Sequence, residues 1–428
     1  MYGGRYTRLF DRLVPLVGDE ALLHALGAAG GVCDGSGDCP DSRVEAGWPF
    51  LGQFVAHDIT ADRSPLVSRA DPAGVRNYRT AAANLECLYG GGPVGSPYLY
   101  YRDDPALLLT GLHAGDVPRN TQGVALIGDP RNDVHLFVNQ LQVALIHAHN
   151  LLVHRLRDDG EPEPSVFDEA RRALTWHYQW VVLNDLLPAL VGQELTARLL
   201  REGPTLYRPG DTPRIPLEFA DAAYRYGHSQ IRDRYRVSQS SEAVPLFPDL
   251  IGFAPVSPER VVSWSLLFDV PGHPPAQRAK RIDGRLPESL IKLPVAITGA
   301  VDEDAYHSLA ARDLQRGQAT ALPSGEAVAR ALGVEPLTPE QVGLAEHGWA
   351  AETPLWFYVL REAAVQQAGD RLGEVGGRIV GDVLVGIIDA DPESYRAVDR
   401  GWRPTLPAAT TDAYGIADLV RAPALANA

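Results

Sequence analysis

The sequence has little positive charge, few cysteines and no long apolar run. Its 428 residues carry a formal net charge of −15, which argues against nucleic-acid binding, because that function needs a basic surface. No stretch approaches the roughly 18 continuous apolar residues of a membrane span, and no apolar signal-peptide core follows the N-terminus. Three cysteines do not make a disulfide framework. These absences predict a cytoplasmic protein without a nucleic-acid or membrane partner.

The sequence also lacks internal repeats and offers few alternating strand patterns. Apolar residues instead recur at three-to-four spacing, which is typical of helices. The segments with this pattern are 134–157, 166–191, 355–367 and 374–390. The predicted fold class is therefore mainly α.

No Ser/Gly-rich linker divides the chain, so we expect a single domain over 1–428. Within it we predict an N-terminal extension (1–45), a catalytic core (46–405) and a C-terminal tail (406–428). Long loops are expected at 62–79, 90–104 and 203–216, and such loops in a compact domain are usually functional. Cys33 and Cys39 flank a glycine-rich stretch that either closes a small disulfide or lies free at the surface.

The stretch GQFVAHDIT (52–60) places polar side chains in an otherwise apolar segment. On a helix over 49–59, Gln53 and His57 are four residues apart and share a face, while Asp58 points about 100° away from His57. Taken alone, His57 is more often a hydrogen-bonded core histidine than a catalyst. The pattern allows a cavity shared by Gln53 and His57, with a different neighbour for Asp58.

Two more polar stretches interrupt the apolar pattern. GDPRND (128–133) delivers Arg131 just before the helix expected from 134, although Asp129 or Asp133 can equally serve as its cap. EFADAAYRYGHSQI (218–231) reads as a helix in which Gly227 removes bulk beside His228. A glycine inside a helix costs about 1 kcal/mol relative to alanine, so it indicates close approach of a flat cofactor or of another helix.

In this order, the motifs resemble those of the animal-type haem peroxidase superfamily, which includes myeloperoxidase and cyclooxygenase, and particularly its bacterial branch. GQFVAHDIT resembles the distal motif, GDPRND the arginine motif, and EFADAAYRYGHSQI the proximal motif. ARDLQRGQATALPS (311–324) and the last two apolar segments extend the resemblance to roughly residues 5–405. It implies a single-domain haem peroxidase fold with long loops around a buried haem.

The resemblance implies roles for three distal residues. His57 would take a proton from hydrogen peroxide and return it to the departing oxygen, and Arg131 would stabilise the negative charge that develops. Gln53 would hold water or halide near the iron. The implied function is a haem-dependent peroxidase that reduces hydrogen peroxide through a ferryl intermediate and oxidises a small organic, aromatic electron donor.

The resemblance also implies a proximal side. His228 would bind the haem iron, and Asp313, where the family usually has asparagine, would accept the N–H of its imidazole. Arg316 and Arg225 would pair with the haem propionates, although both can equally be surface ion-pair residues. An Asp313 carboxylate would lower the reduction potential of the iron.

Two features of the family are altered in this sequence. Mammalian members bind haem through ester bonds from two carboxylates, but the corresponding positions are Ala56 and Val134, and Asp133 is one position out of register. The sequence therefore predicts non-covalent heme b. Since no motif marks the electron donor or the oligomeric state, both stay open.

A calcium ion is implied next to the distal histidine. In the family, the aspartate that aligns with Asp58 binds calcium together with a loop that aligns with residues 80–90. Here the other ligands would be Thr80, the Ala82 carbonyl, Asn84 and Glu86, all oxygen donors that suit a hard cation. Because the family usually has aspartate and serine where this chain has Asn84 and Glu86, an ordinary solvated loop is the alternative.

Other functions compete with a general peroxidase. One is a substrate-specific oxygenating or coupling enzyme of secondary metabolism. Another is a fatty-acid dioxygenase-like enzyme, but its radical tyrosine would fall at Arg225, and we expect Tyr224 and Tyr226 to point elsewhere. A third is a haem-binding protein with little catalysis, against which the retention of the motif residues weighs. A metal site at His147 and His149 is disfavoured, because positions i and i+2 diverge by about 200° on a helix.

Overall fold

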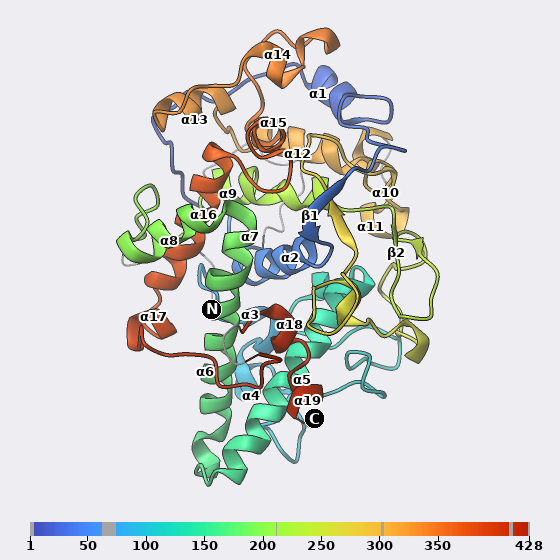
Figure 1. Cartoon of the computed structure of the whole chain (residues 1–428), viewed down its shortest axis with the longest axis vertical. Helices are drawn as coiled ribbons and strands as arrows, with labels where there is room; N and C mark the ends of the chain where they lie inside the picture. The colour runs from blue at the N-terminus through green and yellow to red at the C-terminus, as the bar shows by residue number, and fades with distance from the viewer. Residues whose placement is uncertain (1–3, 62–73, 211, 301–303, 411–413, 427–428) are drawn as a thin grey trace.

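A computed structural model describes residues 4–61, 74–210, 212–300, 304–410 and 414–426 and is mainly helical (Figure 1). The longer helices are α1 (Glu20–Gly27), α2 (Trp48–Ile59), α5 (Leu136–Asp158), α6 (Glu163–Val181), α8 (Gln193–Glu202), α12 (Leu309–Ala319), α13 (Gly325–Ala331), α15 (Leu355–Gln367) and α16 (Glu374–Asp389). One-turn helices are α3 (Glu86–Tyr89), α4 (Gly92–Gly95), α7 (Leu187–Val191), α9 (Leu217–Ala220), α10 (Glu288–Ile291), α11 (Val295–Thr298), α14 (Pro339–Val342), α17 (Tyr395–Val398), α18 (Ile416–Leu419) and α19 (Ala422–Ala426). The 3₁₀ helices include η3 (Pro97–Leu99), η4 (Pro130–Asp133), η6 (Ala223–Gln230) and η9 (Asp304–His307).

The predicted helices 134–157, 355–367 and 374–390 are confirmed within two residues at each end. The segment 166–191 is also helical, as α6, a π-helical turn (Val182–Leu186) and α7. Of the three expected loops, most of 62–79 lies outside the described residues, and 90–104 contains the short turns α4 and η3. The prediction of one helix over 218–231 is wrong, because the segment forms α9 and then the 3₁₀ helix η6.

The core is built from helices that are far apart in the sequence. Figure 1 shows α5 and α6 as a long hairpin, with α2 crossing near its upper end. The helix α5 is long and apolar enough to cross a membrane, but 83% of that stretch is buried inside the protein, as is common for a core helix. The buried faces of α2, α5, α15 and α16 belong to one continuous hydrophobic core.

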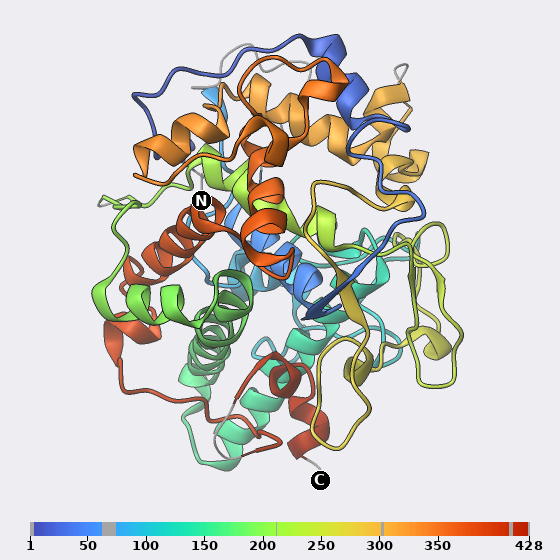
Figure 2. The same cartoon turned by 45° about the horizontal axis from the view of Figure 1, so that its top comes forward.

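Both ends of the chain pack against this core. Figure 2 shows the N-terminal segment running across the helices of residues 288–342, and α1 packs on α12. The carboxylate of Glu218 accepts hydrogen bonds from the backbone N–H groups of Leu9 (3.0 Å) and Phe10 (3.2 Å). At the other end, the backbone N–H of Ile416 donates to Asp185 at 2.6 Å.

Strands are few and short among the described residues. β1 (Asp41–Glu45) pairs antiparallel with β4 (Arg278–Lys280), and β2 (Arg234–Tyr235) pairs antiparallel with β3 (Val244–Pro245). The thiols of Cys33 and Cys39 are free, so the disulfide alternative for this stretch is not formed.

Candidate active site

One cavity of about 300 Å³ brings the predicted site residues together. α2 contributes Gln53 and His57 to its wall, and η6 contributes Arg225 and His228, so that two histidines 171 positions apart face one space. The remaining wall is largely apolar and includes Phe50, Phe219, Ile231, Leu246, Phe247, Leu290 and Leu293. A mostly apolar cavity with a few convergent polar groups is typical of a cofactor site.

His57 is buried and has a defined tautomer. Its Nδ1 lies 2.7 Å from the Oδ1 atom of Asn132, whose own amide nitrogen donates to Gln142 at 2.8 Å. Since an amide oxygen only accepts, Nδ1 of His57 carries the proton and Nε2 is left as the base. Burial, and secondarily the charge of Arg131, lowers the pKa of His57 to about 3, so this base is neutral at ordinary pH.

Arg131 is held against α2 by a carboxylate and two carbonyls. Its Nε and Nη2 atoms donate to the two oxygens of Asp129 (3.0 and 2.7 Å), and Nη2 also donates to the carbonyls of His57 (3.0 Å) and Thr60 (2.7 Å). Asp129 also accepts the N–H of Arg131 and thereby starts η4. None of these bonds uses Nη1, which can therefore serve a molecule in the cavity.

Gln53 has a partner that the sequence did not reveal. Its Oε1 atom lies 2.7 Å from Nε2 of His135. Since Nδ1 of His135 accepts the N–H of Val138 at the start of α5, the proton is on Nε2 and His135 is the donor. Burial lowers the pKa of His135 to about 3, so the pair orients the amide without adding charge.

On the opposite wall, Nδ1 of His228 donates to Oδ2 of Asp313 at 2.6 Å, as the sequence predicted. Arg225 donates to the other Asp313 oxygen at 3.2 Å. Residues three apart eclipse one another in a 3₁₀ helix, and η6 thus points Arg225 and His228 at one carboxylate. Burial alone would raise the pKa of Asp313, but the interactions with His228 and the charges of Arg225 and Arg316 outweigh it and lower that pKa.

The predicted propionate partners are only partly at the cavity. Arg225 lines it, whereas Arg316 lies behind and contacts Asp221 at 3.4 Å, a carboxylate that Arg225 also contacts at 3.3 Å. Arg312, one turn before Arg316 on α12, lines the cavity instead. The side chain of Arg312 donates to the Tyr306 carbonyl at 2.6 Å, which fixes its direction.

The expectation that Tyr224 and Tyr226 point elsewhere is wrong. Both line the cavity, with their rings 5.9 Å apart in an edge-to-face arrangement. Their buried hydroxyl groups have no hydrogen-bond partner among the residues that the structure describes. A Cβ atom at Gly52 would come within 2.9 Å of the Tyr226 hydroxyl, so this tyrosine can approach α2 only because position 52 is glycine.

The positions that would form ester bonds are apolar and face the cavity. Ala56 and Val134 both line it. Asp133 is turned away and makes a two-pronged ion pair with Arg119, at 2.7 and 2.8 Å. No carboxylate is therefore placed to esterify a group between these walls at the three positions considered.

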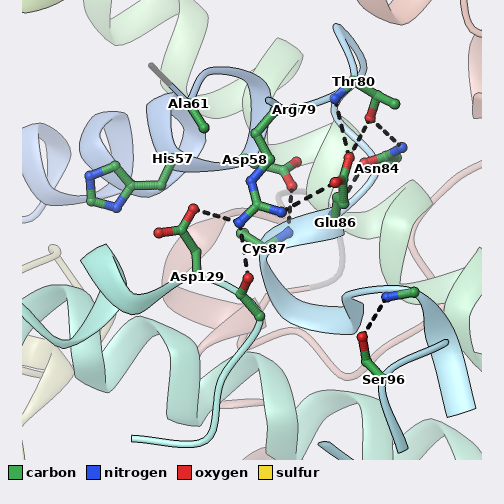
Figure 3. Close-up of polar contacts among 12 residues, drawn as sticks. His57, Asp58, Ala61, Arg79, Thr80, Asn84, Glu86, Cys87, Ser96 and Asp129 are labelled. Atoms are coloured by element: carbon green, nitrogen blue, oxygen red, sulfur yellow. Dashed lines mark hydrogen bonds and ion pairs between the residues drawn. The ribbon is translucent and has the colours of Figure 1, made fainter. Parts of the chain in front are cut away.

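The residues expected to bind calcium lie near one another, but their oxygens are already hydrogen-bonded. Figure 3 shows His57 and Asp58 pointing in different directions from α2, with Asp58 facing the segment of Thr80, Asn84 and Glu86. Ala82 lies in the wall of a separate cavity. Within the described parts of the chain, no group of three His, Cys, Asp or Glu side chains is placed to hold a metal ion.

The walls of the main cavity suit a haem. A haem needs an imidazole nitrogen below the iron, apolar walls beside the ring and cations for its propionates. His228 has Nδ1 fixed by a carboxylate, so Nε2 is the ring nitrogen that could bind a metal. The apolar wall and the arginines Arg225 and Arg312 supply the rest.

Comparison with known proteins decides the family. The family model described as animal haem peroxidase matches residues 99–341. This chain belongs to the animal haem peroxidase family. The matched range contains Arg131, His228 and Asp313, and it begins after His57, so the distal histidine is placed by the fold and not by that match.

Curated relatives of this haem peroxidase family member include two insect proteins. The chain is 25% identical over 296 residues to a chorion peroxidase of Drosophila melanogaster, which covers 65% of this chain and 35% of that protein. It is 32% identical over 117 residues to a chorion peroxidase of Aedes aegypti, covering 26% and 15%. The chain therefore spans about a third or less of the length of these relatives.

Solved structures share the fold along nearly the whole chain. Peroxidase A from Dictyostelium discoideum superposes with a TM-score of 0.71 at 15% identity, covering 98% of this chain and 93% of that chain. A fatty acid alpha-dioxygenase of Arabidopsis thaliana gives a TM-score of 0.65 at 15% identity, covering 93% and 74%. Both results confirm the mainly helical haem peroxidase fold.

Proposed function

We propose that this member of the animal haem peroxidase family is a haem-dependent peroxidase that reduces hydrogen peroxide and oxidises a small organic donor. The observation that carries the proposal is one cavity with His57 and Arg131 on one wall and His228, which is hydrogen-bonded to Asp313, on the other. An acid–base group with a fixed tautomer, a permanent cation and an iron ligand are the groups that peroxide cleavage requires.

His228 would hold the iron of a non-covalent heme b, and Arg225 and Arg312 would pair with its propionates. When bound, the haem supplies the redox chemistry, accepting the oxidising equivalents of peroxide and withdrawing electrons from a donor. The apolar side chains at positions 56 and 134 and the ion pair of Asp133 support non-covalent binding.

The distal residues move the proton. Neutral His57 would take the proton of the peroxide oxygen nearer the iron and deliver it to the outer oxygen, which leaves as water. The guanidinium of Arg131 would stabilise the negative charge on the oxygens as the O–O bond breaks. The His135–Gln53 pair would hold a polar amide beside the reacting atoms.

A small aromatic donor is the substrate that suits the apolar side of the cavity best. Leu290, Leu293 and Ile297 from the α10–α11 region form an apolar side of the cavity. Apolar walls bind an uncharged ring through the hydrophobic effect, at roughly 25 cal/mol per Å² buried. A phenol presents such a ring together with an oxidisable hydroxyl.

Fatty-acid oxygenation is the second candidate, favoured by the placement of Tyr224 and Tyr226 in the cavity wall and by the alpha-dioxygenase fold neighbours. Against it, the position three residues before His228 holds Arg225, which is ion-paired with Asp313 and Asp221.

One experiment separates the candidates. The purified protein is loaded with haem, its Soret band is recorded, and it is mixed with hydrogen peroxide and phenols, or with palmitate and oxygen. We expect a Soret band and saturable, peroxide-dependent phenol oxidation. Palmitate oxygenation without phenol oxidation would support the second candidate. A protein that binds haem but oxidises neither phenols nor palmitate would be a haem-binding protein with little catalysis.

A further inference from the structure

The guanidinium of Arg79 lies beside Asp58, where the family would place calcium (Figure 3). Its Nη1 lies 3.3 Å from Oε1 of Glu86, and its Nη2 lies 2.5 Å from Oδ2 of Asp129. Nη2 also donates to the carbonyl of Gly128 at 3.0 Å. Only 10% of the Arg79 side chain is exposed, so this is a buried cation that joins two segments far apart in sequence.

The side-chain oxygens that would bind calcium accept protein donors instead. The two oxygens of Asp58 accept the backbone N–H groups of Leu85 (3.0 Å) and Cys87 (3.2 Å). Oε2 of Glu86 accepts both the N–H (3.2 Å) and the hydroxyl (2.8 Å) of Thr80. Calcium needs six to eight oxygen ligands, and each carboxylate oxygen has two lone pairs. Both lone pairs of the Glu86 Oε2 atom are taken by Thr80, and Oε1 faces the cation of Arg79. These residues do not fit calcium.

Asn84 completes the closed network. Its Oδ1 atom accepts the N–H of Glu86 at 3.1 Å, and its amide nitrogen donates to the Thr80 hydroxyl at 3.2 Å. The segment from Thr80 to Cys87 is thus folded onto itself and onto Asp58 by its own hydrogen bonds. Leu85, at its centre, is held with a left-handed φ of 58°, which is uncommon outside glycine.

We propose that Arg79 replaces the calcium ion of the family as a built-in cation and positions the catalytic arginine. Arg79 and Arg131 both donate to the same oxygen of Asp129, Oδ2, at 2.5 and 2.7 Å. The ion pair with Arg79 fixes the Asp129 carboxylate, and that carboxylate fixes the Arg131 side chain against the carbonyls of α2. Arg79 is a positioning residue, because its side chain is absent from the cavity wall.

The first test measures calcium and thermal stability in the haem-loaded protein, and it does not depend on peroxidase activity. We expect no stoichiometric calcium by elemental analysis, and a melting temperature that changes by less than about 2 °C between excess chelator and millimolar calcium chloride. About one calcium per chain, together with a larger fall of the melting temperature in chelator, would overturn the proposal.

The second test uses Arg79→Met and Arg79→Lys, with the exposed Arg76→Met as the matched control. We expect Arg79→Met to lower the melting temperature and to slow the peroxide-induced Soret change by about tenfold, because Arg131 loses its fixed position. Arg79→Lys should recover part of both losses, as should guanidinium ion added to Arg79→Met at concentrations below denaturation.

Two outcomes would contradict the link with Arg131. One outcome is that the Arg79→Met variant has the same melting temperature as the Arg76→Met control. The other is Arg79→Met that is destabilised but, in the folded fraction, reacts with peroxide at the wild-type rate. This second outcome would leave Arg79 a purely structural cation. The link rests on the proposed peroxidase function; the replacement of calcium does not.

Discussion

On the proximal side, Nδ1–H of His228 donates a hydrogen bond to a buried carboxylate, whereas on the distal side Nδ1–H of His57 donates one to the amide oxygen of Asn132. A carboxylate draws the N–H proton and makes the other ring nitrogen a stronger ligand. An amide adds no charge, so burial and the charge of Arg131 still lower the pKa of the distal imidazole, which stays neutral. In the proposed function, one residue type would therefore serve as a ligand or as a proton carrier according to the charge of its partner.

The largest expected effect comes from removing the distal base. His57→Ala should slow the reaction with peroxide by about 10³-fold while haem binding persists, because general acid–base catalysis contributes on that scale. Stopped-flow absorbance and a Soret titration measure the two quantities. His135→Ala, which removes another buried imidazole from the same cavity, is the control, and an equal loss in both variants would contradict the assignment.

Exchanging the distal partner tests the comparison directly. In the wild type the pKa of His57 is lowered to about 3, so the peroxide rate constant should be level from about pH 5 to 8. Asn132→Asp places a carboxylate beside Nδ1 and should raise that pKa. The variant's rate constant should then fall as pH decreases, by about tenfold between pH 8 and pH 5. A level profile in the variant would count against the neutral-amide explanation.

The reciprocal exchange is Asp313→Asn. We expect haem affinity to fall by about tenfold, as is typical when the hydrogen-bond partner of a metal-bound histidine is lost, and the reduction potential of the iron to become more positive. Haem transfer to apomyoglobin and redox titration measure these effects. Asp221→Asn removes a carboxylate from the same arginine cluster without touching His228, and it should leave the potential nearly unchanged.

A further prediction concerns stability in acid. The folded-state pKa of His57 lies below the ordinary 6.5, so the folded protein binds fewer protons than the unfolded chain between about pH 6.5 and 3. The contribution of His57 to the free energy of unfolding is therefore fully present above pH 6.5. It is lost as pH falls, by up to about 1.4 kcal/mol per pH unit. Urea unfolding at several pH values measures this effect. In His57→Asn, the free energy of unfolding should change less steeply with pH than in the wild type.

On the proximal side, Asp313 should affect stability in a different pH range. The pKa of Asp313 is lowered from 3.8, so its contribution is present above about pH 4 and is lost only as pH falls further. Asp313→Asn should therefore leave the slope between pH 6.5 and 4.5 as in the wild type. A changed slope in that range would show that the two sides are not independent.

The sequence predicted the anchoring residues of both walls because each lies within a short motif at a fixed spacing. The cavity is lined by His57, Arg131 and His228, and His228 is hydrogen-bonded to Asp313. The long helices also lie close to their predicted bounds. Local pattern could not supply the partners: Asn132 meets His57 across 75 positions. It also could not show that residues 223–230 form a 3₁₀ helix, since that geometry depends on the contact of His228 and Arg225 with Asp313.

The proposed replacement of calcium by Arg79 depends on a residue that the motif does not include. Thr80, Asn84 and Glu86 occupy aligned positions, but the decisive residue is their neighbour Arg79, whose guanidinium faces Asp129 from a distant segment. A charged side chain beside a motif can be exposed or buried, and only the packing of α2 against residues 79–87 distinguishes the two.

The carboxylate of Glu218, which holds the N–H groups of Leu9 and Phe10, has a consequence for handling the protein. A shortened protein that starts at residue 11 would lack both N–H groups that donate hydrogen bonds to this buried carboxylate. Glu218 lies in α9, just before the η6 helix that carries His228, so we expect such a shortened protein to lose haem before it loses its fold.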